Sequence, residues 1–310
     1  MLVVVALGGN AILRRGEPMS VARQRDSIAE ACVPLAQIAE QHELVVSHGN
    51  GPQVGLLALQ AAAYQEVSEY PFDVLGAQTE GMLGYLIEQE LGNQLGNDRP
   101  IATLVTRVVV DPSDPAFADP SKFVGPLYTQ DEARAVAEHR GWQMKADGLS
   151  MRRVVPSPTP IRILEISPIR WILQHHGVVI CAGGGGVPTT QDPASDLVVG
   201  VEAVIDKDLT SAVLARDLGA DMLVIATDVA GVYTGWGGPE QRLVARAHPD
   251  ALDPEVFPAG SMGPKVRAAV QFARESGHVA VIGALRDIDA MFSGSAGTSV
   301  SVDHVGLEYQ

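Results

Sequence analysis

The sequence is poor in positive charge and in cysteine. Its 310 residues carry a formal net charge of −15. Nucleic acids and anionic membranes bind basic surfaces, so this balance argues against either as the main partner. The two cysteines, Cys32 and Cys181, lie in a helix-like segment and at the end of an apolar run. We therefore expect buried apolar side chains here, rather than a disulfide or a metal pair.

Long hydrophobic runs and several catalytic motifs are also missing. No apolar stretch approaches the ~20 residues that a membrane helix needs, and no basic region precedes the short first apolar run, as it would in a signal peptide. Motifs typical of zinc hydrolases, serine esterases, Walker-type sites and dinucleotide-binding folds do not occur. The sequence predicts a cytoplasmic globular enzyme, and it indicates no metal-ligating residues.

What the sequence does contain is an alternation of apolar runs and amphipathic segments. The apolar runs, which predict strands buried on both faces, span 2–9, 43–51, 100–110, 177–186, 220–229 and 278–285. Helical spacing is found over 21–41, 208–219 and 264–277, and the last two segments end in Gly219 and Gly277, where a helix cap is expected. This alternation predicts an α/β fold around a largely parallel central sheet.

One region interrupts the alternation. From about 111 to 160 the chain is rich in Pro, Asp and Gly and has one helix-like piece near 129–140. We interpret it as a protruding subdomain outside the sheet. The lobe boundary is expected to follow it, which divides the chain into an N-terminal lobe over 1–170 and a C-terminal lobe over 171–310.

Three glycine-rich loops follow predicted strands, at 6–11, 47–55 and 181–188. In open α/β sheets, ligands bind beyond the carboxyl ends of the strands. Glycine there lets an anion, most often phosphate, approach backbone N–H groups. For a single loop, turn geometry alone explains glycine about as well, but three such loops in one chain favour an anion site.

Lysine is scarce, and its placement supports the same interpretation. Of the 22 basic residues, four are lysines, namely Lys122, Lys145, Lys207 and Lys265. Lys207 and Lys265 lie at the start of predicted helices, where a positive side chain is unfavourable unless an anion lies beside it. Phosphoryl transfer needs such cations and N–H donors around the moving group. The alternatives remain a solvated charge cluster for Lys207, a surface lysine for Lys265 and ordinary loop lysines for the other two.

Two further segments carry candidate residues. The segment 224–233 ends a strand in Thr-Asp and continues to a tyrosine, which would suit a nucleotide pocket. His48 in the second glycine loop is either catalytic or held by a structural hydrogen bond.

Taken in order along the chain, these motifs resemble those of the carbamate kinases, a branch of the amino acid kinase superfamily. The segments that carry the resemblance include ALGGNAIL, SHGNGPQVG, CAGGGGVP, IDKDLTSAVLA, ATDVAGVY and GSMGPKV. The resemblance implies an open αβα sandwich with a protruding subdomain, in which the N-terminal lobe takes the acceptor and the C-terminal lobe the nucleotide. It further implies a homodimer and Mg²⁺ with ATP or ADP. It also implies reversible phosphoryl transfer between ATP and carbamate, run towards ATP in catabolism, with arginine, purine and ureide breakdown as alternative sources of carbamoyl phosphate.

The resemblance also implies roles for particular residues. The substrate would be cradled by the backbone of Gly8, Gly9, Asn10, Gly49, Asn50 and Gly51. The catalytic residues would be Lys122, Lys207, Asp208 and Lys265, with Asp208 orienting the lysines. The nucleotide would be surrounded by Thr227, Asp228, Tyr233 and Met262. Several relatives have a lysine at the start of the first loop, where this chain has Ala6-Leu7, so Lys207 is expected to supply that charge. The alternatives are a paralogue that phosphorylates another small carboxylate and an inactive nucleotide-sensing homologue.

Overall fold

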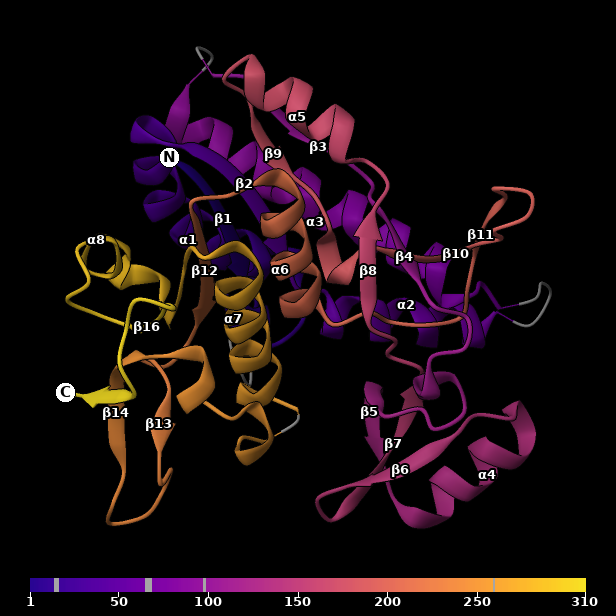
Figure 1. The fold of residues 1–310 in the computed structure, drawn as a ribbon. Coiled ribbons are helices and arrows are strands. Elements are labelled where there is room, and N and C mark those ends of the chain that lie inside the picture. The colour runs from indigo at the N-terminus through magenta and orange to yellow at the C-terminus, as the bar shows by residue number, and fades with distance from the viewer. Residues whose placement is uncertain (14–16, 65–68, 97–98, 259) are drawn as a thin grey trace.

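A computed structural model describes residues 1–13, 17–64, 69–96, 99–258 and 260–310. Its centre is one twisted sheet (Figure 1). The strands of this sheet are β1 (Leu2–Leu7), β2 (Glu43–His48), β3 (Ile101–Thr103), β9 (Val178–Ile180), β12 (Met222–Thr227), β13 (Tyr233–Thr234), β14 (Arg242–Ala247), β15 (Val279–Ala284), β16 (Thr298–Val300) and β17 (Leu307–Tyr309). They lie in the order β13-β14-β16-β15-β12-β1-β2-β9-β3, with β17 beside β14. All neighbours from β15 to β3 are parallel, which confirms the largely parallel sheet.

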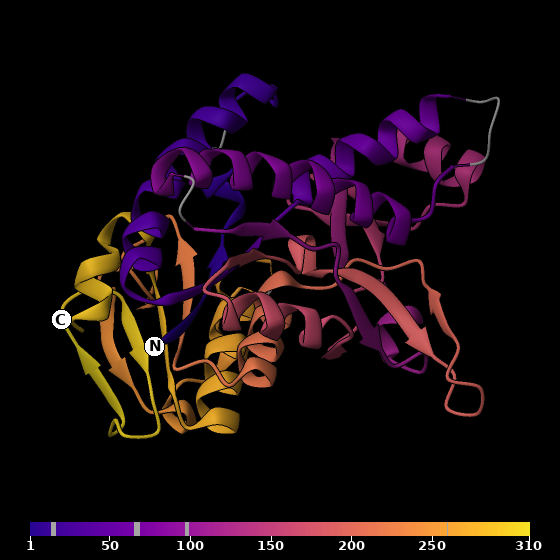
Figure 2. The same cartoon turned by 90° about the horizontal axis from the view of Figure 1, so that it is seen from above.

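Helices cover both faces of the sheet, as Figure 2 shows. One face is covered by α1 (Val21–Gln41), α3 (Phe72–Leu95) and α8 (Ile288–Phe292), and the other by α5 (Ile166–Gln174), α6 (Lys207–Leu218) and α7 (Met262–Ser276). Side chains alternate between the two cores along each strand: Val4 packs with α6 and α7, whereas Val3 and Val5 pack with α1 and α3. The open αβα sandwich is confirmed.

The ends of two helices follow the sequence prediction. Gly219 after α6 and Gly277 after α7 both have φ near +74° and donate their N–H to carbonyls of the last turn. This left-handed conformation favours glycine and closes the helix. The segment predicted over 21–41 forms α1 with the same bounds.

The prediction of a single strand over 100–110 is wrong. β3 ends at Thr103, and the chain then enters a second sheet. The strands of that sheet are β4 (Arg107–Val110), β8 (Pro160–Ile163), β10 (Val187–Gln191) and β11 (Val198–Gly200), in the order β11-β10-β4-β8. The cause lies at Thr106, whose N–H donates to Glu80 Oε2 at 2.8 Å instead of joining a strand ladder. Its hydroxyl also donates to Leu104 O at 2.9 Å.

Residues 122–155 form a separate unit at one end of the molecule (Figure 1). The unit contains β5 (Lys122–Tyr128), α4 (Gln130–Arg140), β6 (Met144–Asp147) and β7 (Ser150–Val155), with an antiparallel sheet in the order β5-β7-β6. Thr129 and Glu132 cap the start of α4 reciprocally. The helix predicted near 129–140 is therefore present, and the three strands beside it are an addition to the prediction.

In the part of the chain that the structure describes, the remaining helical segments are one α-helix and several short 3₁₀ turns. They are α2 (Gly51–Ala63) and the 3₁₀ turns η1 (Gly9–Ala11), η2 (Pro115–Phe117), η3 (Gly183–Gly185), η4 (Pro249–Ala251), η5 (Pro254–Val256) and η6 (Leu285–Asp287). Within the described ranges, no helix combines the length and the apolar character needed to cross a bilayer. The central sheet continues across residue 170, because β1 pairs with β12, and the division into an acceptor lobe and a nucleotide lobe stays a prediction.

Candidate active site

Bare backbone gathers at the carboxyl ends of three neighbouring strands, β1, β2 and β12. A Cβ atom on Gly8 would lie 2.9 Å from the carbonyl oxygen of Ala226 at the end of β12. A Cβ on Gly49 would lie 3.4 Å from the backbone nitrogen of Gly9. Side chains at these positions would fill the space between the loops, so the first two glycine loops lie against each other as predicted. The side chain of Asn10 lies outside the described part of the chain.

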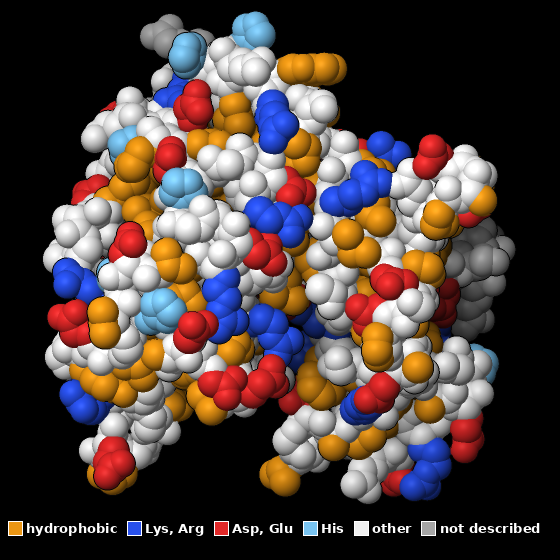
Figure 3. Space-filling model, in the orientation of Figure 1, with side chains coloured by type: hydrophobic (Ala, Val, Ile, Leu, Met, Phe, Trp, Pro, Cys, Tyr) orange, Lys and Arg blue, Asp and Glu red, His pale blue; other side chains and the backbone are white. Residues whose placement is uncertain are grey.

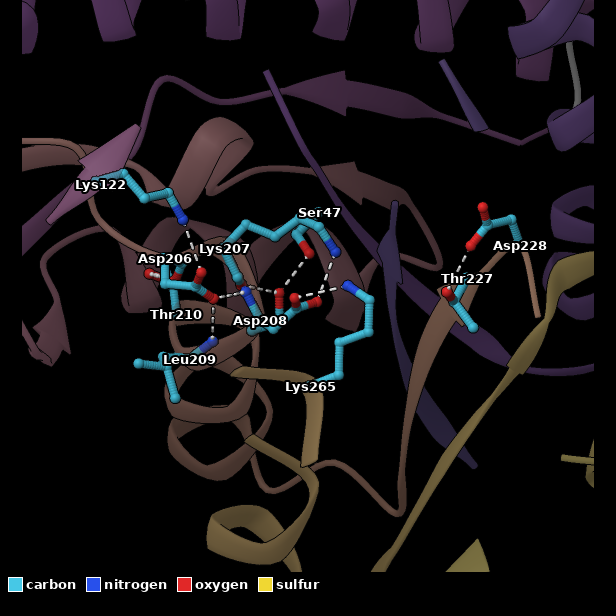
Figure 4. Close-up of polar contacts among 11 residues, drawn as sticks. Ser47, Lys122, Asp206, Lys207, Asp208, Leu209, Thr210, Thr227, Asp228 and Lys265 are labelled. Carbon is cyan, nitrogen blue, oxygen red and sulfur yellow. Dashed lines mark hydrogen bonds and ion pairs between the residues drawn. The ribbon is translucent and has the colours of Figure 1, made fainter. Parts of the chain in front are cut away.

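Two of the scarce lysines meet on one carboxylate (Figure 4). Lys207, the first residue of α6, donates from Nζ to Asp208 Oδ1 at 2.6 Å. Lys265, in the first turn of α7, donates from Nζ to Asp208 Oδ2 at 2.9 Å. Asp208 is only 4% exposed. The structure thus places two ammonium groups, separated by 58 positions in the sequence, on either side of one buried acid.

A third lysine approaches from the subdomain. Lys122, the first residue of β5, donates from Nζ to Asp206 Oδ2 at 2.8 Å. Figure 3 shows a hollow between the body of the molecule and the subdomain, with basic side chains at its inner end. Lys145, the fourth lysine, lies apart and pairs with the exposed Asp119 at 2.6 Å. The structure therefore brings together the three lysines that were predicted to be catalytic and excludes the fourth.

Burial and charge act in opposite directions on these groups. Burial alone would raise the pKa of Asp208, but attraction to Lys207 and Lys265 outweighs it and holds that pKa well below its usual range. Burial lowers the pKa of Lys207, and repulsion from Lys265 adds to this effect. One carboxylate between two ammonium groups leaves a net positive charge, which is the electrostatic environment that a phosphoryl group requires.

Buried hydroxyl groups join the lysines to the glycine loops. Ser211 Oγ donates to Lys207 O at 2.6 Å and lies 2.6 Å from Ser47 Oγ, at the end of β2. Both serines are fully buried. A Cβ on Gly49 would lie 3.7 Å from Lys207 Cε. Sequence reasoning missed Ser47 and Ser211, because nothing in their spacing along the chain indicates that they meet.

The third glycine loop has a different role from the one predicted. Gly183 to Gly186 are buried, and a Cβ on Gly183 or Gly184 would overlap the His48 ring or the Asn50 amide. Asn50 Nδ2 donates to Thr79 Oγ1 at 2.8 Å. This loop therefore packs against His48 and Asn50 of the second glycine loop and does not open toward a ligand. The bare backbone here is required by packing.

His48 is structural rather than catalytic. The residue is 1% exposed, and its Nδ1 lies 3.1 Å from Gly49 O. Burial lowers the pKa of His48 to about 4, so the ring is neutral near neutral pH. It fixes the loop that contains Gly49.

The residues predicted to bind the nucleotide lie on three different elements, at the end of β12, in β13 and at the start of α7. Thr227 ends β12 and Asp228 follows it, with Thr227 Oγ1 3.2 Å from Asp228 Oδ1. Both lie across Lys265 from Lys122 (Figure 4). Met262 begins α7 and packs against the core. Tyr233 lies in β13, edge-on to Trp236 with 5.2 Å between ring centroids. The 65% exposed Trp236 is an aromatic residue that sequence reasoning did not consider.

The subdomain is held close to the site by a contact between two glycines. A Cβ on Gly55 of α2 would lie 2.9 Å from the backbone nitrogen of Gly125 in β5. We expect Gly55→Ala to push β5 away from α2 and to lower the free energy of unfolding by about 1–3 kcal/mol. Gly81→Ala is the control, because Gly81 lies on the exposed side of α3 and an added Cβ would meet no atom of another element within 4 Å. The control should gain up to about 1 kcal/mol. Equal urea midpoints for the two variants would contradict this close packing.

The chain is similar to known proteins along nearly its whole length. The sequence profile of the amino acid kinase family matches residues 1–284. The carbamate kinase of Haemophilus influenzae is 53% identical over 309 residues, which is 100% of this chain and 99% of that protein. The carbamate kinase of Rhizobium meliloti is 55% identical over 302 residues, 97% of this chain and 93% of that protein. The structure of carbamate kinase from Giardia lamblia bound to AMP-PNP is 36% identical, with a TM-score of 0.88 and coverage of 97% and 98% of the two chains.

Proposed function

The chain belongs to the amino acid kinase family, and from this premise we propose that it catalyses reversible phosphoryl transfer between ATP and carbamate. The products are ADP and carbamoyl phosphate. The observation that carries the proposal is the convergence of Lys207, Lys265 and Asp208 beside the glycine loops of β1 and β2. Identities of 53% and 55% to carbamate kinases along nearly the whole chain support the choice of substrate.

The chemistry asks little of the protein beyond position and charge. A carbamate oxygen attacks the γ-phosphorus of ATP, an O–P bond forms, and the bond to the ADP oxygen breaks. No general base is needed, because the carbamate oxygen is already anionic. Backbone N–H groups of Gly8, Gly9, Asn10, Asn50 and Gly51 are proposed to hold carbamate and the moving phosphoryl group. The Gly49 N–H donates to Leu7 O at 3.1 Å, so Gly49 contributes bare backbone rather than a donor.

The lysines neutralise the charge that spreads over the phosphoryl oxygens. Lys207 and Lys265 are proposed to contact these oxygens, while Asp208 keeps both ammonium groups on the same side of the site. Lys207 also lies beside Gly49, which supports its role as the cation that replaces a lysine at Ala6-Leu7. Lys122 is proposed to cover carbamoyl phosphate from the subdomain.

The nucleotide and its metal complete the site. Thr227, Asp228, Tyr233 and Met262 are proposed to surround ATP or ADP. Within the described residues, no group of three His, Cys, Asp or Glu side chains could hold a metal ion, and Asp206 and Asp208 are both occupied by lysines. The protein alone therefore does not fit Mg²⁺, and we propose that the ion arrives on the nucleotide phosphates, as is common for this ion.

Several finer properties rest on the family alone. We propose a cytoplasmic homodimer that consumes carbamoyl phosphate and forms ATP, with arginine breakdown as one source of that substrate.

The direct test is ATP formation from ADP and carbamoyl phosphate, followed in a coupled assay with purified protein. We expect turnover with carbamoyl phosphate and much weaker turnover with acetyl phosphate or other acyl phosphates. Preference for another acyl phosphate would indicate a paralogue with a different acceptor. ATP binding without any turnover would indicate an inactive homologue and would overturn the proposal.

A further inference from the structure

One carboxylate, that of Asp206, serves two separate parts of the molecule (Figure 4). Its Oδ1 accepts the N–H groups of Asp208 at 2.9 Å and of Leu209 at 3.4 Å, which caps the start of α6. Its Oδ2 accepts Lys122 Nζ at 2.8 Å. The helix that it caps carries Lys207 and Asp208 in its first turn. Lys122, with which it pairs, is the first residue of β5, the strand that begins the subdomain.

We propose that Asp206 is a positioning residue that holds Lys122 at the phosphoryl-transfer site and fixes the subdomain relative to the start of α6. The inference rests on the proposed function, because it takes Lys122 as a ligand of carbamoyl phosphate. It adds a residue to which the sequence motifs assign no role.

The backbone around this pair supports the assignment. Lys122 is paired with Val155 in the β5–β7 ladder. One residue further along, Pro156 O accepts the N–H of Val204 at 2.9 Å. The segment that leads into Asp206 is therefore bonded to the strand end beside Lys122. Both sides of the ion pair are held at their backbones, so forming the pair has to order only the two side chains.

The environment of the pair gives it more weight than an ordinary surface ion pair has. The side chain of Asp206 is 15% exposed and that of Lys122 is 34% exposed, so screening by water is reduced. Burial lowers the pKa of Lys122, but attraction to Asp206 and Asp208 outweighs burial and places that pKa above its ordinary value. An ammonium group has three donors, and among the described residues Asp206 is its one hydrogen-bond partner. The remaining donors suit substrate oxygens.

The experiment separates this role from the helix cap. Asn caps a helix about as well as Asp, so Asp206→Asn keeps the cap and removes the charge. We expect the KM for carbamoyl phosphate to rise about tenfold, as for the loss of a hydrogen bond to a charged group, with a smaller change in kcat. In a Lys122→Met background the same substitution should have no further effect on KM. An equal effect with and without Lys122 would overturn the proposal, as would a fall in KM.

Controls address folding and nonspecific charge effects. Asp119→Asn removes the partner of Lys145, whose Nζ lies 2.6 Å from Asp119 Oδ1. This ion pair is not part of the proposed site, so the substitution should leave KM unchanged. Asp206→Ser keeps a good capping residue and should reproduce the effect of Asp206→Asn. Melting temperatures of all variants show whether the fold is retained.

A second readout does not depend on activity. The chain has four lysines, so lysine labelled with ¹³C at Cε gives four signals, and Lys122→Arg identifies the signal of Lys122 by its loss. In the ligand-free protein, Asp206→Asn should move the titration of Lys122 to lower pH and leave the chemical shift of Lys145 at neutral pH unchanged. An unmoved Lys122 signal would overturn the ion pair itself. A moved signal in a protein without carbamoyl phosphate turnover would keep the ion pair and reject the proposed function.

Discussion

Lys265→Ala is expected to lower kcat for ATP formation by about 10²–10³-fold, the usual cost of removing one group that stabilises transition-state charge. Lys265 Nζ lies 2.9 Å from Asp208 Oδ2, and its side chain is 15% exposed. The substitution leaves Asp208 paired with Lys207 at 2.6 Å, so no buried carboxylate is left without a cation. The loss should therefore appear in turnover and not in folding. Initial rates in the coupled assay, with circular dichroism for the fold, measure both.

The matched control for this prediction is Lys145→Ala. Lys145 is 40% exposed and pairs with Asp119, which is 83% exposed, so the ion pair is of the kind that contributes little. We expect wild-type turnover in this variant. Wild-type turnover in Lys265→Ala would remove Lys265 from the mechanism, whereas equal losses in both variants would point to a general effect of net charge.

The parts of the site that sequence could predict are those with a local cause. Lysine at a helix start conflicts with the local preference of that position unless an anion is nearby, and several glycine loops at strand ends favour a ligand more than a single one does. For this reason Gly8, Gly49, Lys207 and Lys265 could be identified before the fold was known. The glycines that end α6 and α7 were also predictable, because a helix that ends in the left-handed conformation favours glycine at that one position.

The parts that sequence could not predict depend on contacts between distant segments. The strand predicted over 100–110 divides because Glu80, in α3, accepts the N–H of Thr106. The third glycine loop is buried because Asn50 and His48 occupy the space where side chains would lie. Ser47 meets Ser211 across 164 positions of sequence. None of these pairings leaves a periodic or motif-like trace in the chain.

Asp208→Asn is expected to be the most damaging single substitution in the site. Asp208 is 4% exposed and accepts hydrogen bonds from Lys207 and Lys265. Removing one partner of a buried charge group costs about 3–5 kcal/mol of folding free energy, because the remaining charges are left uncompensated. Turnover should fall as well, since the two ammonium groups lose the acceptor that orients them. Urea unfolding and the coupled assay measure the two effects separately.

The pH dependence of this loss identifies its electrostatic origin. In the wild type the pKa of Asp208 lies well below its usual range, so its contribution to stability is complete at neutral pH and is lost progressively as the pH falls below the ordinary aspartate pKa of about 4. In the variant, the pKa of Lys207, already lowered by burial, should fall further. The unfolded chain then binds more protons than the folded one, so the stability of the variant rises as pH increases.

We therefore expect the difference in unfolding free energy between wild type and Asp208→Asn to be similar at about pH 5 and pH 7 and smaller at about pH 9, where lysine loses its proton more readily in the folded state. Asp119→Asn, which affects an exposed pair, should show no such trend. A loss that stays constant from neutral to alkaline pH would mean that Asp208 acts through packing rather than through the charges of the two lysines, and the electrostatic account of the site would then be wrong.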